Sequence, residues 1–194
     1  MKKFKIIPLL IAAVLAAAPL CGCSKNNTEQ SQTSYNDKLE GIAEHEFKAD
    51  IAEEVSGNET TFKLNSVIDS GMTEENGGRY FYLDAVIGNP TEKSYDLNIL
   101  NNFYLLFPDK TEAHFDVRTQ IYAGKNIENY IESPFTLTPN GEISGIIGGF
   151  IVPPGINEFT VCFFPSQDME NDKSNVIKVD VSASDIITLP KPQQ

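Results

Sequence analysis

Few residues in this chain could build a catalytic or metal site. The 194 residues include two histidines and three cysteines. His45 and His114 lie in unrelated stretches, and no nucleophile-elbow motif places a serine where either histidine could activate it. We therefore expect no catalytic residues, no enzymatic activity and no cofactor.

Acidic stretches offer a second kind of chemistry. Asp168–Asp172 is rich in oxygen ligands, but an EF-hand loop needs Gly at its sixth position and Glu at its twelfth. Lys173 and Val179 stand there instead. The stretch is best interpreted as a solvated turn, so no metal ligands are assigned. A looser calcium or small-ligand site built from loops stays the alternative.

The first 22 residues have the pattern of a removable export signal. Lys2, Lys3 and Lys5 precede an apolar run over Ile6–Leu20. That run is shorter than the ~20 residues of an ordinary membrane span and matches the apolar region of a signal peptide.

The sequence Leu20-Cys21-Gly22-Cys23 resembles a bacterial lipobox. The resemblance implies cleavage after Gly22 and a diacylglycerol on Cys23. Cys21 fits less well, because Leu20 would then occupy the small-residue position. An ordinary secreted protein and an uncleaved anchor are the alternatives. We expect lipid-anchored attachment at the extracytoplasmic face of the cell membrane.

Charge and cysteine content limit the partners and the redox chemistry. Removal of the signal would leave 27 acidic and 12 basic residues, a formal charge of −15. Such a chain is not expected to bind nucleic acid or to dock electrostatically on anionic lipids. Cys162 would be the one unmodified cysteine, so an intramolecular disulfide is not expected.

The residues before 59 divide into a tether and an arm. The stretch 24–37 is polar and is expected to be a flexible tether behind Cys23. The stretch 36–55 has apolar residues every fourth position, which suits a helix, and it also alternates from Phe47 to Val55, which suits a strand. A short helix or an irregular arm is favoured, within a first segment of 23–58.

From Thr60 onwards, apolar residues alternate with polar ones in short runs separated by turn signals. The expected strands cover 62–68, 80–87, 95–99, 103–107, 142–152, 159–163 and 176–181, with 113–117 as a possible hairpin partner of 103–107 and a short run at 135–137 before the turn at 138–141. Seven or eight such strands without alternating helices are typical of an all-β, antiparallel β-sandwich. We therefore predict a sandwich over 59–183 and a C-terminal tail over 184–194.

The tyrosines are the candidates for a binding surface. Tyr80 and Tyr82 share a face of their strand opposite Phe81 and Leu83. If the latter two face the core, both tyrosines stand on the outer face of the sheet, and Tyr122 and Tyr130 follow in a later segment. Tyrosine suits interfaces because it supplies a large contact area at little entropic cost. The alternative is that these rings pack under the later segment.

Three blocks together resemble one family. They are Gly78–Asn89 with the following Pro-Thr, Phe103–Thr111, and Leu137–Glu142 continuing to Gly149–Pro153 and Phe159. In this order they resemble the telokin-like, immunoglobulin-fold extracellular domains of bacterial lipoproteins. The resemblance implies an immunoglobulin-like sandwich at the cell surface and carries no catalytic residues. Residues 118–133 depart from the pattern and are read as an inserted connection with one helical turn.

These observations predict a non-catalytic binding or interaction module held at the membrane by Cys23. Its partner would be an extracellular protein or a cell-envelope ligand. The turn at 70–78 and the insertion at 118–133 are the segments where binding is expected.

Overall fold

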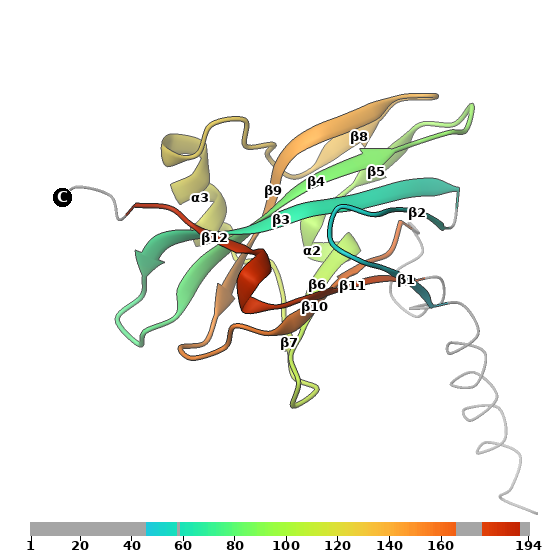
Figure 1. The fold of residues 1–194 in the computed structure, drawn as a ribbon. Helices are drawn as coiled ribbons and strands as arrows, with labels where there is room; N and C mark the ends of the chain where they lie inside the picture. The colour runs from blue at the N-terminus through green and yellow to red at the C-terminus, as the bar shows by residue number, and fades with distance from the viewer. Residues whose placement is uncertain (1–45, 58, 166–175, 191–194) are drawn as a thin grey trace, which may run out of the picture.

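The computed structural model describes residues 46–57, 59–165 and 176–190. Two twisted sheets face each other across one hydrophobic core, and a helix covers the outer side of one of them (Figure 1). This is the all-β, immunoglobulin-like sandwich that the strand spacing predicts.

The first sheet contains the long strands of the domain. Its order is β12-β3-β4-β9, and β2 also pairs with β3. The strands are β2 (Glu54–Gly57), β3 (Thr60–Thr73), β4 (Arg79–Gly88), β9 (Glu142–Val152) and β12 (Ile186–Thr188). The three long strands are paired antiparallel, and β12 runs parallel to β3.

The second sheet is built from shorter strands in the order β1-β11-β10-β6-β7. They are β1 (Phe47–Ala49), β6 (Phe103–Leu106), β7 (Glu112–Ala113), β10 (Phe159–Phe163) and β11 (Ile177–Val181). A separate two-stranded antiparallel sheet is formed by β5 (Tyr95–Leu97) and β8 (Phe135–Leu137). The helical elements of the described residues are α2 (Ile99–Asn102), α3 (Val117–Asn126) and η1 (Ala183–Asp185).

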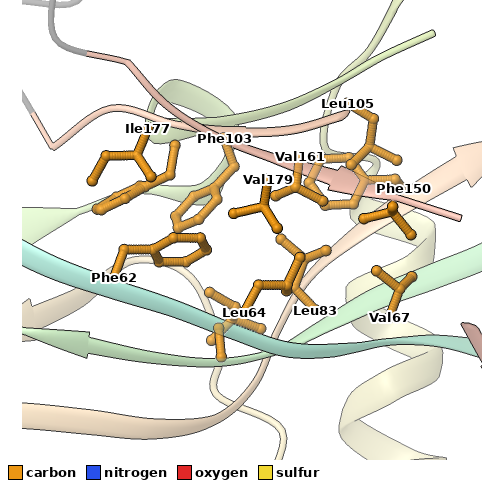
Figure 2. Packing of buried hydrophobic residues seen from close by; sticks show 14 of the residues in the cluster. Phe62, Leu64, Val67, Leu83, Phe103, Leu105, Phe150, Val161, Ile177 and Val179 are labelled. Carbon is orange, nitrogen blue, oxygen red and sulfur yellow. The ribbon is translucent and has the colours of Figure 1, made fainter. Parts of the chain in front are cut away.

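The core forms where the inward faces of the two sheets meet (Figure 2). Phe103 and Phe163 stack with ring centroids 4.6 Å apart, and Phe62 lies against Phe163 at 4.9 Å. All three rings are essentially inaccessible to solvent. Alternation along each strand sends one set of apolar side chains inward, as the pattern predicts.

Bulges change that alternation in two of the long strands. In β3 the pairing register shifts between Leu64 and Ser66, so that Val67 joins the core and Ile68 faces outward. The sequence pattern had Phe62, Leu64, Ser66 and Ile68 on one face. A bulge inserts one extra residue and inverts the faces that follow it, which strict period-two reasoning cannot anticipate.

The segment before residue 59 is not a helix where the structure describes it. Residues 47–49 and 54–57 are the strands β1 and β2, so the helical prediction is wrong there. β1 pairs in parallel with β11, and its partners are Ile177 to Val179. The long-range partner resolves the ambiguity, because a three-residue strand gains its hydrogen bonds from a segment far away in the chain.

The expected C-terminal tail also differs from the structure. Ser182 and Asp185 form a capping box around η1, and Ile186–Thr188 then pairs with β3. The sheet therefore extends beyond residue 183 and begins before residue 59. The described residues contain twelve strands, more than the seven or eight predicted, because strands of two to four residues leave little alternation to detect.

Candidate functional site

Tyr80 and Tyr82 lie on the outward face of β4, as their position opposite Phe81 and Leu83 predicts. Phe81 and Leu83 belong to the central core, whereas the two tyrosines belong to a separate cluster on the other side of the sheet. Outward does not mean exposed here, because Tyr80 is 5% and Tyr82 0% accessible.

The insertion covers these two rings. It contains the ten-residue helix α3, so the prediction of a connection with one helical turn is wrong. Asp116 caps the helix by accepting a hydrogen bond from the Arg118 amide, and Thr119 and Ala123 are the helix residues buried against the sheet. Gly124 and Asn126 lower the intrinsic helix propensity of this segment. The stability of α3 therefore depends on its packing against the sheet.

Aromatic pairs join the insertion to β4. Tyr80 and Tyr122 meet edge to face with centroids 5.8 Å apart, and Tyr82 and Tyr130 do the same at 5.9 Å. Both geometries are favourable for rings with a negative face and a positive edge. The four tyrosines that the sequence singled out therefore form one cluster between α3 and the sheet.

The hydroxyl groups of Tyr80, Tyr82 and Tyr130 donate hydrogen bonds to other groups within the protein. Tyr82 donates to the carbonyl oxygen of Thr119 at 2.8 Å, and Tyr130 donates to that of Gly148 at 2.7 Å. Tyr80 donates to the carboxylate of Glu74. Burial, with the neighbouring Glu74 carboxylate, raises the pKa of Tyr80 to about 12, and burial raises the pKa of Tyr82 and Tyr130 above the usual tyrosine range. These phenols stay neutral donors at physiological pH.

Two glycines in β9, Gly148 and Gly149, allow α3 to pack closely on the sheet. A Cβ atom at Gly149 would lie 1.9 Å from the Thr119 hydroxyl oxygen, and both Gly148 and Gly149 have positive φ. The pairing register of β4 with β9 shifts where these glycines lie, so they form a bulge at which helix and sheet approach closely.

Arg118 connects α3 to the turn between β3 and β4. Its guanidinium makes two contacts with Asp116, at 3.0 and 2.8 Å, and a third with Glu74 at 2.9 Å. The hydrogen bonds from Arg118 lower the pKa of the Asp116 carboxyl. The turn 70–78 and the insertion 118–133, predicted separately as binding segments, therefore lie side by side.

The exposed apolar residues of this region are not the tyrosines. Val117 and Ile121, one helical turn apart on α3, are each 58% exposed, and Met72 in β3 is 37% exposed. We call Val117 and Ile121 the distal face. The i, i+4 spacing of Val117 and Ile121 is visible in the sequence, but recognising it requires knowing that the segment is a helix.

The position of the tyrosines supports the packing alternative rather than an exposed surface. Tyr80 and Tyr82 are covered, and Tyr122 and Tyr130 are half-buried against them. Whether any of the four contacts a partner stays a prediction, and their visible role is to hold α3 on the sheet.

Other candidate residues have structural surroundings where they are described. Cys162 is buried, and His114 is half-exposed with Glu112 at 3.2 Å. Across residues 46–57, 59–165 and 176–190, no group of three or more His, Cys, Asp or Glu could hold a metal ion. Cys23, His45 and Asp168–Asp172 lie outside the described residues, so lipidation and the acidic loop are not tested.

None of the helices in the described part of the chain has the length and apolar character that crossing a membrane requires. No protein-family model matches the sequence, and no curated protein matches it either.

Solved structures share the fold at low sequence identity. The YcdA protein of Bacillus subtilis, described as a candidate lipoprotein, is 13% identical with a TM-score of 0.50, and the match covers 68% of this chain and 39% of YcdA. The YjhA protein of B. subtilis is 17% identical with a TM-score of 0.48, covering 69% and 98%. The secreted protein MPT63 of Mycobacterium tuberculosis is 9% identical with a TM-score of 0.47, covering 69% and 96%.

The similarity to YcdA shows a shared β-sandwich and nothing finer at this level of identity. The resemblance of this chain to telokin-like domains stays a prediction. What the structure establishes is an immunoglobulin-like sandwich whose outer face is covered by a tyrosine-anchored helix.

Proposed function

We propose that the protein is an extracytoplasmic, membrane-anchored module that binds a partner and catalyses no reaction. The observation that carries the anchoring half is the lipobox-like sequence ending at Cys23, behind a basic and apolar export segment. A diacylglycerol supplies two acyl chains, and two chains anchor stably where a single one binds reversibly.

The arrangement of the sandwich supports the binding half. The described chain starts at β1, which lies at the opposite end of the molecule from α3 (Figure 1). A domain tethered through its N-terminal side would hold the distal face away from the membrane. Val117 and Ile121 are neighbouring exposed apolar side chains on a strongly acidic protein, and the partner is proposed to contact them there.

Cys23→Ala tests the anchoring directly. The variant should move from the membrane fraction to the soluble extracytoplasmic fraction, whereas Cys21→Ala, two residues earlier, should remain with the membrane. Because neither position lies in the sandwich, thermal melting of the two variants should agree. Retention of Cys23→Ala in membranes would refute the lipid assignment.

Site-specific photocrosslinking in intact cells tests the distal face. A photoreactive residue at Ile121 should give a discrete adduct, and the same residue at Lys48, an exposed position in β1, should not. Replacement of Val117 by Glu should abolish the adduct, because a charge on an apolar contact must be desolvated. Equal crosslinking from both positions, or none from Ile121, would contradict binding at this face.

A further inference from the structure

The long strand β9 lies at an edge of the first sheet, where its neighbour in the strand order is β4. The other strands at sheet edges in the described residues have two to four residues, whereas β9 has eleven. An edge strand presents a row of main-chain N–H and C=O groups with which another chain can pair, and very short edge strands are one way to avoid such pairing. The length of β9 means that it needs a different protection.

The composition of β9 would favour pairing with another strand. The strand Glu142–Val152 contains one charged residue and no proline. Ile147 and Phe150 lie in the central core, whereas Ile146 and Ile151 pack against the tyrosine cluster on the opposite face. Because β9 is apolar on both faces and also rich in glycine, its sequence specifies the pairing register only weakly, and strands of this kind are prone to alternate pairings.

Residues 115–131, which include α3, lie along the outer edge of β9. We call this segment the edge cover. Near the end of β9, the Asp116 amide donates a hydrogen bond of 3.0 Å to the carbonyl oxygen of Gly149. Phe115 and Phe150 form an antiparallel bridge pair beside it. One end of the edge cover is therefore bonded to main-chain groups of β9 itself.

The other end of the edge cover is bonded to the middle of β9. The Ile146 amide donates to the carbonyl oxygen of Asn129 at 3.1 Å, and the Ile146 carbonyl oxygen accepts from the Ile131 amide at 2.8 Å. A Cβ atom at Gly145 would lie 2.8 Å from the Asn129 carbonyl oxygen and 2.9 Å from the Ile131 side chain. The edge cover thus occupies the hydrogen-bonding positions that an added strand would use.

The rest of the edge is protected in two other ways. Between the two bonded ends, α3 packs over the bulge at Gly148 and Gly149, with Thr119 against the second glycine. Bulges interrupt the regular ladder that an added strand requires. At its start, β9 has the exposed carboxylate of Glu142, and a charged side chain at an edge also opposes pairing.

We propose that the edge cover keeps β9 from pairing with the β9 strand of a second copy of this protein. Two copies of an antiparallel edge strand can pair about a two-fold axis, with the same residues on both sides, so the chain is its own best-matched partner. The proposal goes beyond the binding function proposed above. It does not depend on lipidation or on the distal face, whose side chains are exposed to solvent on α3.

Sedimentation velocity measures the self-association that this proposal predicts. All variants are made in the full-length chain carrying Cys23→Ala, which excludes association through an acyl chain, and this parent should be monomeric. Gly145→Ala places a methyl group against the Asn129 carbonyl oxygen, and Ile131→Pro removes the amide that bonds to Ile146 without altering β9. Both variants should shift the mass at micromolar concentration from one chain to two or more.

A matched control and a rescue variant identify the edge as the cause. Gly88→Ala lies in β4, inside the same sheet, and crowds the side chain of Thr61 rather than the edge cover, so it should remain monomeric. Adding Ile146→Pro to Gly145→Ala removes an N–H group that β9 directs to its outer edge. The double variant should therefore be monomeric again.

The other outcomes overturn the proposal. Thermal melting shows which of Gly145→Ala and Ile131→Pro keep a cooperatively folded sandwich, and monomers of such a variant would mean that the edge cover is not needed. Association of the parent would mean that the edge cover does not prevent pairing. Equal association of Gly88→Ala would indicate general instability, and failure of Ile146→Pro to restore the monomer would indicate contact through side chains instead. The membrane and crosslinking tests are unaffected by any of these results.

Discussion

The hydroxyl group of Tyr82 on β4 donates a hydrogen bond of 2.8 Å to the main-chain carbonyl oxygen of Thr119 on α3. Both residues are fully buried, so this bond joins helix and sheet where water does not compete. A helix with weak intrinsic propensity is therefore held in place by tertiary contacts beneath it.

Removal of that hydroxyl should weaken the attachment of α3. Tyr82→Phe keeps the ring and its edge-to-face contact with Tyr130, and it should lower the free energy of unfolding by about 1 kcal/mol. Urea unfolding followed by circular dichroism measures the change. Tyr95→Phe is the control, because the Tyr95 hydroxyl bonds to Glu59 in an exposed position and its loss should cost less. Equal effects would mean that burial of the Tyr82 bond is unimportant.

Replacement of Gly149 should destabilise the protein by more than backbone strain alone would, because it also disturbs the packing of α3 on the sheet. Gly149→Ala places a methyl group against Thr119 at a positive φ, and we expect a loss of about 3 kcal/mol or more. Gly155→Ala also has positive φ but nothing within 4 Å, so it should cost only about 1 kcal/mol. Thermal melting of the two variants gives the comparison. Similar losses would show that the close approach at Thr119 is not sterically limiting.

The ion pairs of Arg118 should make the region around α3 sensitive to acid. The pKa of Asp116 is lowered in the folded state, first by its hydrogen bond with Arg118, so this carboxylate contributes stability above its unfolded pKa of ~3.9. That contribution is lost as pH falls through the folded pKa. Asp116→Asn preserves a good N-cap residue but cannot titrate. The melting temperature of Asp116→Asn should therefore fall less between pH 5 and pH 3 than that of the natural chain, and identical slopes would contradict this.

Truncation of a core ring tests the packing between the sheets. Phe103→Ala should lower the free energy of unfolding by about 3–5 kcal/mol, because Phe103 is buried and stacks on Phe163. Leu100→Ala, three residues earlier on the exposed side of α2, should change it by less than about 0.5 kcal/mol. Denaturant unfolding of both variants checks the difference. A nearly unchanged midpoint for Phe103→Ala would refute its place in the core.

The alternation of residues was sufficient to predict the fold class and the faces of β4. Phe81 and Leu83 lie inward and Tyr80 and Tyr82 outward, because side-chain direction in a strand depends on local geometry alone. Adjacent glycines in an apolar strand, such as Gly148 and Gly149 of β9, are also a local signal, because they are typical of a bulge or of a close approach of backbone.

Contacts between distant segments decided the rest. The strands β1 and β12 exist because of parallel partners in β11 and β3, and the tyrosines are covered because a helix of weak propensity packs on them. The sequence by itself determined which residues alternate and which are apolar, because those properties are local. Only the tertiary structure decided which outward faces are exposed, because exposure depends on what another segment of the chain covers.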